Sequence, residues 1–309
     1  MIRTPTVLIL GAGASADYGF PLGRRLRDLV CEFPRSYAAK ELLRAGFKEE
    51  ELSRFVDTLR HSGYTSVDWF LERWPEFIPI GKASIAAVLI PLEDPDRLFP
   101  PRSPEQHWYE LLLNTLDSDE DRFTENRLSI VTFNYDRSIE HYLFTALHTR
   151  RRSEKVADAD FANIEIIHVH GSLGKFLPRE PAGRGYSPTL DAAAIRQAAE
   201  EIIVVGEASD DTREFERARC VLSGARRIVF LGFGFHRESV RRLAVFNDHW
   251  DDARHARVAV SGTSRGIPTH EWNRIQREVL NNGISSKSRS ECDVFLFLNQ
   301  VKPIADWAL

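Results

Sequence analysis

The chain has 309 residues, of which 43% are apolar and 28% are charged, and its formal net charge is −4. This length is sufficient for a full hydrophobic core, and the slightly acidic balance gives no basis for broad affinity for nucleic acids or membranes. Cys31, Cys220 and Cys292 lie far apart and form no C-x-x-C pair, which excludes a four-cysteine zinc site and argues against a disulfide framework. No signal peptide is recognisable and no apolar run approaches ~18 residues, so we expect a cytoplasmic protein without membrane-spanning segments.

The first predicted element is a buried strand followed by a glycine-rich turn. Val7–Leu10 is entirely apolar, as in a parallel strand covered on both faces. Gly11–Ala16 follows with the spacing G-x-G-x-x-A and predicts the start of a helix. In this pattern Gly11 permits a tight turn, Gly13 lets the backbone approach a diphosphate, and the free N–H groups of the helix favour an anion. We therefore predict a nucleotide site, with a plain strand-turn-helix unit as the alternative, formed by Gly11, Ala12, Gly13, Ala14 and Ser15.

The segment after this turn does not follow the dehydrogenase pattern. An NAD-dependent dehydrogenase has a second strand that ends in an acidic residue about 20 positions after the glycine motif. Here Leu22–Phe33 has helical spacing, and its acidic residues Asp28 and Glu32 fall within the predicted helix. Hydride transfer is therefore a minor hypothesis.

Helical periodicity dominates the next part of the chain. Glu41–Leu59 and His107–Leu116 carry apolar residues at helical spacing, and prolines interrupt Phe77–Pro104. Because no comparable strand occurs before Leu128, we interpret residues 36–124 as a helical insertion.

The second half of the chain contains the remaining predicted strands. They are Leu128–Phe133, Ile164–Val169, Glu201–Val205, Arg227–Leu231, Arg257–Val260 and Asp293–Leu298. Their spacing predicts an α/β fold with a Rossmann-like, mostly parallel sheet and crossover helices. Residues 1–35 and 125–309 would then form the nucleotide-binding core of a single domain that covers residues 1–309.

Two further segments each allow two interpretations. Proline and glycine are frequent in Pro178–Pro188, which predicts a loop that is either a lid or a surface excursion. Arg150–Arg152 is the densest basic cluster, and it indicates either a solvated face or a contact with phosphate or nucleic acid.

Four segments resemble the sirtuin family in the same order along the chain. The first, GAGAS followed by GFPLGR, resembles the sirtuin signature GAG-x-S followed by GIPDFR, with Pro21 and Arg24 at matching positions. The other three resemble the family's TQNID, its His-Gly and its later glycine turn, and they are Thr132–Asp136 (TFNYD), His168–Ser172 (HVHGS) and Val229–Phe235 (VFLGFGF). Each segment lies at the end of a predicted strand, where open α/β sheets bind ligands.

Departures from the sirtuin deacylases indicate which group within the family the chain resembles. Leu22 and Gly23 replace the aspartate and phenylalanine of GIPDFR, and no cysteine lies between Cys31 and Cys220 to form the zinc module. With a helical insertion instead, the chain is similar to the zinc-less, sirtuin-like NAD hydrolases of bacterial antiphage defence. That resemblance implies NAD as the substrate, no metal, and abortive depletion of NAD. It also implies a homo-oligomer, or control by a regulatory partner or an appended domain, with nucleic acid involved only indirectly.

The catalytic candidates follow two of the predicted strands. His170 is the predicted general base, because histidine titrates near neutral pH, although it could instead only hydrogen-bond a neighbouring loop. Asn134 could hold a water or a ribose hydroxyl beneath the anomeric carbon, or it could cap the next helix. Asp136 could stabilise cationic character or bind ribose, or it could be a helix N-cap. We expect His168, two residues before His170 and on the same face, to be structural.

The remaining binding candidates are assigned to parts of the dinucleotide. Ser15 is expected to contact phosphate, and Arg24 to contact either the diphosphate or a neighbouring carboxylate. Gly232 and Gly234 would let the backbone approach the adenosine half, or would only form a tight turn. Ser261 would contact the adenine ribose.

These residues predict an NAD glycohydrolase that releases nicotinamide and ADP-ribose. A second enzymatic hypothesis is ADP-ribosyl transfer or deacylation of protein, although the missing zinc module argues against deacylation. A third is a non-catalytic subunit that senses NAD or ADP-ribose for a partner such as a ring-forming ATPase. The presence of both Asn134 and His170 argues against a purely binding role.

Overall fold

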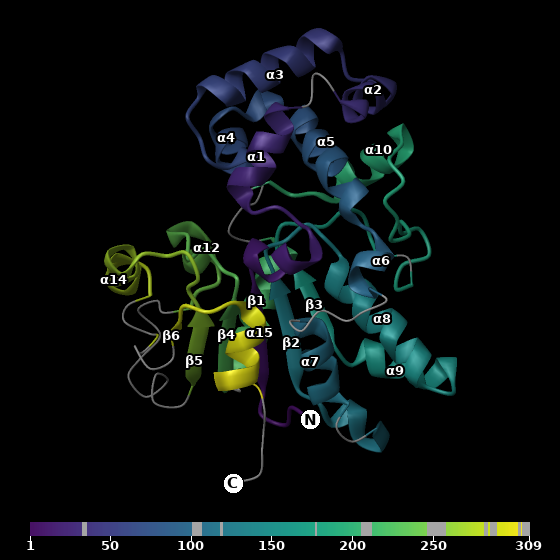
Figure 1. Cartoon of the computed structure of the whole chain (residues 1–309), viewed down its shortest axis with the longest axis vertical. Helices are drawn as coiled ribbons and strands as arrows, with labels where there is room; N and C mark the ends of the chain where they lie inside the picture. Colours follow the sequence, from purple (N-terminus) through teal and green to yellow (C-terminus); the bar gives the residue numbers. More distant parts are fainter. Residues whose placement is uncertain are drawn as a thin grey trace.

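The computed structural model describes residues 1–32, 36–100, 107–117, 120–176, 178–204, 212–245, 258–280, 284, 289–301 and 304. In these residues one parallel sheet has six strands in the order β3-β2-β1-β4-β5-β6 (Figure 1). The order reverses between β1 and β4, as in dinucleotide-binding folds. The predicted α/β class with a Rossmann-like parallel sheet is therefore confirmed. The strands are β1 (Thr6–Leu10), β2 (Leu128–Thr132), β3 (Glu165–His168), β4 (Arg227–Leu231), β5 (Ala259–Thr263) and β6 (Arg289–Ser290).

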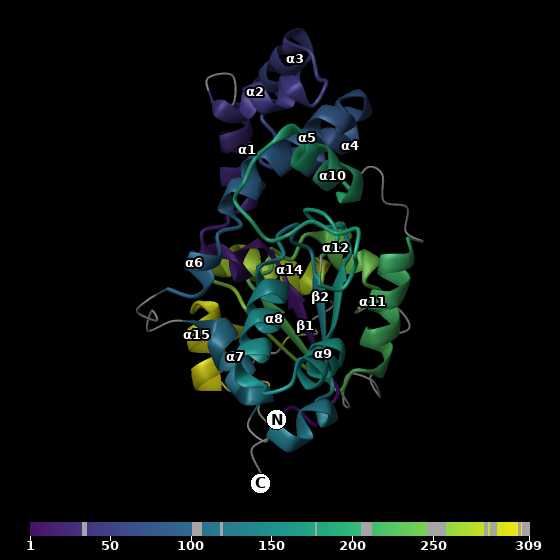
Figure 2. The same cartoon turned by 90° about the vertical axis from the view of Figure 1, so that its right-hand side faces the viewer.

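Alternate residues of β1 face two helical layers, because successive side chains of a strand point to opposite faces. Leu8 and Leu10 pack in a core with α7, α8 and α15, which we call the α7 face. Val7 and Ile9 pack in a second core with α11, α12 and α14, the α11 face. Figure 2 shows α7 and α15 on one side of the sheet and α11 on the other. These helices are α7 (Trp108–Leu116), α8 (Ser138–Arg150), α11 (Arg213–Gly224), α12 (Arg237–Arg242), α14 (Thr269–Glu278) and α15 (Val294–Leu296), and α9 (Glu154–Ala162) packs on α8.

A third group of helices stands beyond the carboxyl end of the sheet, at the top of Figure 1. Its centre is the buried helix α5 (Ile78–Leu89), which packs against α1, α2, α3 and α10. The stretch Pro75–Leu92 is the one candidate membrane span in the described residues, by length and composition, but 61% of it is buried inside the structure. The other members are α1 (Gly23–Cys31), α2 (Tyr37–Arg44), α3 (Glu49–His61), α4 (Val67–Arg73) and α10 (Ala192–Glu201), and α6 (Pro95–Leu98) leads back toward the sheet.

The spatial grouping of helices differs from the predicted boundaries. Helices α1 and α10, which come from segments assigned to the core, belong to the group beyond the sheet. Helix α7, from the predicted insertion, packs on the sheet instead. The predicted helix over Glu41–Leu59 is in fact two helices, α2 and α3, because the chain turns at Gly46 with a φ of 110°.

Two predicted strands are wrong. In Glu201–Val205, Glu201 ends α10, residues 202–204 form no strand, and Val205 lies outside the described residues. Ile202 and Val204 are buried by packing rather than by a ladder, and the Ile203 amide donates one hydrogen bond to the His170 carbonyl. Burial alone produced the apolar pattern, which does not distinguish a strand from a buried connection.

The second wrong strand, Asp293–Leu298, is helical. The Asp293 side chain accepts a hydrogen bond from the Leu296 amide and caps α15. Val294, Phe297 and Leu298 are buried at helical spacing. The last described strand is β6, which the apolar pattern missed because Arg289 and Ser290 are polar. Strand β5 lies further along the chain than predicted, at Ala259–Thr263, and Arg257 is outside the described residues.

The loop at Pro178–Pro188 is tied down by a buried ion cluster. Glu93 follows the apolar stretch Pro75–Leu92. It accepts two hydrogen bonds from Arg137, at 2.9 and 2.7 Å, and another from Arg184 of the loop. Arg137 also donates to the carbonyls of Arg184 and Gly185, at 2.7 and 3.1 Å. The loop is therefore anchored to the start of α8.

The basic cluster at Arg150–Arg152 is engaged in ion pairs. Arg151 is buried and donates to Asp160 and Asp117, each at 2.6 Å. Arg150 pairs with Asp117 at 3.1 Å. Two of the three arginines thus hold α8 against α9 and the end of α7.

Candidate functional site

A cavity of about 780 Å³ opens at the carboxyl end of the parallel strands. The turns after β1, β2, β3, β4 and β5 all contribute to its wall, and the helices beyond the sheet form part of its other side. Open α/β sheets bind ligands at this edge, where the strand order reverses. The lining residues from the strand ends include Gly11, Ala12, Gly13, Phe133, Asn134, Tyr135, His170, Gly232, Phe233, Gly234, Thr263, Ser264, Arg265, Gly266 and Ile267.

The glycines of the β1 and β4 turns allow these two turns to touch. A Cβ on Gly11 would lie 2.6 Å from the Gly232 carbonyl oxygen, and one on Gly13 would lie 2.8 Å from the Gly232 Cα. The Gly11 amide donates to Leu231 and the Gly13 amide donates to Gly232, each at 3.0 Å. These glycines therefore join the two halves of the sheet, and their amides are already used within the protein.

The helix predicted directly after the glycine turn is absent from that position. Two 3-10 turns follow β1 instead, η1 (Ala12–Ala14) and η2 (Ala16–Tyr18), and the Ala14 and Ser15 amides donate to Gly11 and Ala12. The first α-helix, α1, begins later. Leu22 and Gly23 at its amino end line the cavity, and Leu22 has no side-chain group that could cap the first turn. Within the part of the chain that the structure describes, no side chain caps the first turn of α1, so its N–H groups are available to an anion.

Asn134 is held by the turns on both sides of it. Its Nδ2 atom donates to the Gly11 carbonyl and to Ser15 Oγ, each at 3.0 Å. Its backbone carbonyl accepts a hydrogen bond from His168 at 2.9 Å. With Nδ2 engaged, Oδ1 is the amide atom that remains for a ligand hydroxyl or a water in the cavity.

His170 lines the cavity in an apolar setting. Its ring contacts Phe133 and Phe215 edge to face, with centroids 5.5 and 5.7 Å apart. Burial, together with the charge of Arg242, lowers the pKa of His170 to about 4, so the imidazole is neutral at pH 7. Its Nδ1 atom is buried and has no hydrogen-bond partner in the described residues.

His168 is not among the residues that line the cavity. Its Nε2 atom bonds Glu140 of α8, while Nδ1 bonds the Asn134 carbonyl. Burial lowers the pKa of His168, but the Glu140 charge and hydrogen bond outweigh burial and leave it raised. The His168–Glu140 pair therefore positions the backbone of Asn134.

Ser15 and Asp136 lie behind the cavity wall rather than in it. Both are buried, and Asp136 accepts hydrogen bonds from the Ser138 amide, at 3.2 Å, and the Ser138 hydroxyl. Burial raises the pKa of Asp136, although hydrogen bonds from Ser138 and Ser15 oppose this. Tyr109 bonds Ser138 Oγ at 2.7 Å and extends the network into α7. The geometry fits a capping and positioning role for Asp136.

The structure brings together seven of the predicted site residues in the cavity wall: Gly11, Ala12, Gly13, Asn134, His170, Gly232 and Gly234. The others, Ala14, Ser15, Pro21, Arg24, Asp136 and Ser261, are not part of the lining. Arg24 is exposed on the first turn of α1, and Ser261 lies in the middle of β5 rather than at its end.

Several lining residues were not identified from the sequence. Thr263–Ile267 follow β5, and the rule that ligands bind at strand ends would have found them had the strand been placed correctly. No motif in the sequence indicates Asp17 or Asp293, because they reach the same cavity only through elements that lie far apart in the chain. Asp68 and Trp69 of α4 line the cavity too: Tyr135 donates to Asp68, and the ring centroids of Trp69 and His236 lie 4.9 Å apart. The sequence does single out these two residues, in the segment SVDWFL, as either a functional feature of the helical insertion or a buried anchor.

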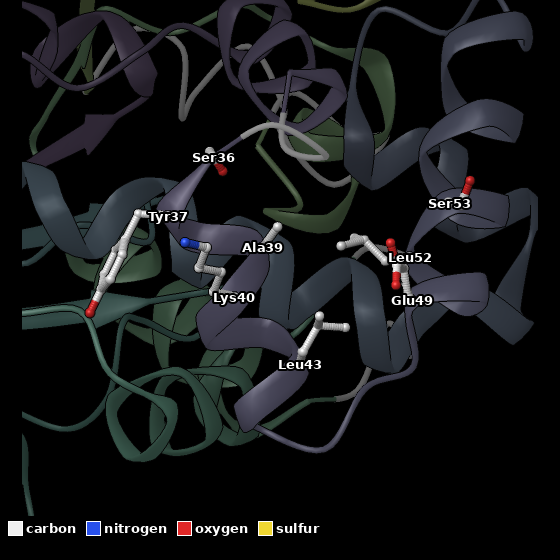
Figure 3. Close-up of a pocket in the computed structure, with 8 residues that line it drawn as sticks. All are labelled: Ser36, Tyr37, Ala39, Lys40, Leu43, Glu49, Leu52 and Ser53. Atoms are coloured by element: carbon white, nitrogen blue, oxygen red, sulfur yellow. The ribbon is translucent and has the colours of Figure 1, made fainter.

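A second depression of about 500 Å³ lies between α2 and α3, away from the sheet (Figure 3). Its charged residues are Lys40 and Glu49, and its other lining residues are Ser36, Tyr37, Ala39, Leu43, Leu52 and Ser53. None of the described residues that line it is a histidine or cysteine, so we place the functional site in the larger cavity. Among the described residues, no group of three or more His, Cys, Asp or Glu side chains is arranged to hold a metal ion.

Comparison with known proteins does not assign the chain to a family. No protein-family model matches it, and no curated protein matches it.

Proposed function

We propose that the protein hydrolyses the nicotinamide–ribose bond of NAD. The observation that carries this proposal is that a neutral His170 and the anchored amide of Asn134 line one cavity at the β1–β4 reversal point. Reversal points of parallel sheets bind dinucleotides, and the cavity volume is within the range of small-molecule sites.

Hydrolysis of this bond needs a bound water molecule and a base that accepts its proton. When the C–N bond breaks, its electron pair goes to the pyridinium nitrogen, so nicotinamide leaves as a neutral molecule and positive charge develops on the ribose. Asn134 Oδ1 holds the attacking water or a ribose hydroxyl by accepting its proton in a hydrogen bond. His170 takes the proton that the water loses as its oxygen bonds the anomeric carbon. The products are nicotinamide, ADP-ribose and one proton.

The diphosphate is assigned to the amino end of α1. Leu22 and Gly23 border the cavity there, the first-turn amides have no capping side chain, and the helix dipole favours an anion. Arg265 is an additional cation in the cavity wall. This assignment replaces the β1 glycine turn, because the amides of Gly11, Gly13, Ala14 and Ser15 are already bonded.

A binding role without turnover is the second candidate. The observation that favours it is the low pKa of His170, about 4, because a group so weakly basic accepts a proton less readily at neutral pH. In that case the cavity would sense NAD or ADP-ribose for a partner. For either role we propose a cytoplasmic protein of bacterial antiphage defence that acts as a homo-oligomer or with a regulatory or ATPase subunit.

The test is release of nicotinamide and ADP-ribose from NAD, followed by chromatography, at low and high protein concentration. We expect turnover by the wild type and a loss of at least about 100-fold in His170→Ala and Asn134→Ala. His61→Ala, on the exposed part of α3, is the matched control and should retain full activity. Calorimetric binding of NAD without any turnover would favour the binding role. Absence of both binding and turnover would contradict both candidates.

A further inference from the structure

The cavity has an acidic side opposite His170. Asp17 of η2 and Asp293, which precedes α15, both line it. His170 contacts Phe215 on the α11 face of the sheet, whereas Val294, next to Asp293, packs on the α7 face. His170 follows β3, whereas Arg265, whose charge acts on Asp17, follows β5 on the other side of β1. The carboxylates therefore lie toward the opposite end of the cavity from His170.

Both carboxylates have oxygens that a ligand can reach. Asp293 Oδ1 accepts the Leu296 amide at 2.8 Å, which leaves its second oxygen, and the Asp17 carboxylate accepts no hydrogen bond in the described part of the chain. Burial raises the pKa of Asp17, the Asp293 charge raises it further, and the Arg265 charge lowers it. The two carboxylates are thus close enough to repel each other.

We propose that Asp17 and Asp293 bind the hydroxyl groups of the ribose farther from the scissile bond, and that the cavity therefore takes NAD in preference to NADP. This inference rests on the proposed function, which places the nicotinamide ribose at His170 and Asn134. The two carboxylates share this cavity with His170, a buried residue whose Nδ1 atom has no hydrogen-bond partner in the described residues.

The selectivity follows from charge and hydrogen bonding. An ionised carboxylate can only accept hydrogen bonds. Each of the two vicinal hydroxyls of a ribose can donate one, so a pair of carboxylates can hold both hydroxyls. A 2′-phosphate would replace one of these donors by a dianion beside two carboxylates, and like charges placed together disfavour a ligand strongly. Arg265 is the opposing group, since it lines the same side of the cavity, but it is one exposed cation against two anions.

The experiment compares kcat/KM for NAD and NADP, and calorimetric binding of ADP-ribose and 2′-phospho-ADP-ribose, in the wild type, Asp17→Asn and Asp293→Asn. We expect the wild type to favour the ligands without the 2′-phosphate by at least about tenfold, and each variant to lower that ratio. Both substitutions keep the side-chain shape, and asparagine still caps α15. Asp158→Asn, an exposed change of the same charge on α9, should leave the ratio unchanged.

The outcomes separate this inference from the proposed function. Turnover of NAD and NADP at equal rates would overturn the selectivity while the hydrolase remained. Tighter binding of ADP-ribose in the absence of any turnover would support the selectivity and contradict the hydrolase. A preference for the 2′-phosphorylated ligands would assign this side of the cavity to Arg265 and overturn the inference.

Discussion

Asn134 Nδ2 donates a hydrogen bond of 3.0 Å to the carbonyl oxygen of Gly11, a residue 123 positions away in the chain. The same nitrogen donates to Ser15 Oγ, so both amide hydrogens are used inside the protein. This arrangement fixes which end of the side chain can face the cavity. It also makes the site sensitive to a change that removes only the donor.

Asn134→Asp would place an oxygen where Nδ2 now faces two acceptors. We expect a loss of about 1–3 kcal/mol in the free energy of unfolding, from urea titration, because these acceptors lose their donor. Asn114→Asp, at an exposed site where the side chain already accepts from Arg150, should be neutral. An unchanged stability in Asn134→Asp would contradict the hydrogen bonds described for Nδ2.

The pH dependence of turnover should reflect the low pKa of His170, about 4. A general base acts in its neutral form, so kcat/KM should rise as pH increases through about 4 and stay level between roughly pH 6 and 8. The measurement is a pH–rate profile over the range in which circular dichroism shows the protein folded. An inflection near the ordinary histidine value of 6.5 would show that His170 is less buried in solution than in the structure.

Gly232→Ala should disrupt the contact between the two halves of the sheet. Gly232 has a φ of +57°, and a Cβ there would lie 2.6 Å from the Gly13 Cα. The strained φ and the overlap together predict a loss of at least about 2 kcal/mol in the free energy of unfolding. Gly224→Ala is the matched control, since a Cβ there meets nothing within 4 Å and its φ is not in the left-handed region. Equal stability of the two variants would mean that the β1 and β4 turns are not in contact.

Glu93→Gln should destabilise the fold because it removes the one carboxylate between two buried arginines. The side chains of Glu93 and Arg137 are 0% and 1% exposed, and Arg184 is 9% exposed. Leaving these cations without their counter-charge should cost about 3–5 kcal/mol, measured by chemical denaturation. Glu125→Gln, in the exposed pair with Arg122, should leave stability unchanged. Proteolysis within Pro178–Pro188 should also become faster in Glu93→Gln, since Arg184 anchors that loop.

The ion pair between His168 and Glu140 should make the folded state most stable within a limited pH range. The pKa of His168 is raised, so its contribution is complete below the unfolded value of 6.5 and is lost as pH rises through the folded value. The pKa of Glu140 is lowered, so its contribution is complete above the unfolded value of 4.5 and is lost as pH falls through the folded value. The melting temperature should therefore be highest between the two unfolded values, 4.5 and 6.5, and should decrease toward lower and toward higher pH. His168→Gln should flatten the alkaline limb, and an unchanged limb would exclude the ion pair.

The sequence by itself was sufficient to locate the strands that form the centre of the sheet. β1, β2 and β4 are covered on both faces, so nearly every residue is apolar and the run is visible without knowledge of its neighbours. It also located most of the residues that follow these strands and line the cavity, including Asn134 after β2, and it located His170 after β3, because a polar or glycine residue after a buried strand stands out.

Hydrogen-bond partners and contacts between distant segments were decided by the tertiary structure, because the local sequence pattern does not contain them. An apolar run records burial but not the hydrogen-bond partner, so Ile202–Val204 and Val294–Leu298 had the pattern of strands without being strands. Ser15 and Asp136 became internal hydrogen-bonding groups because the packing of α7 and α8 closes over them. Asp17 and Asp293 share a cavity only because α15, which follows the edge strand β6, packs back in the same core as β1. Such proximity depends on long-range packing, and no spacing within one segment encodes it.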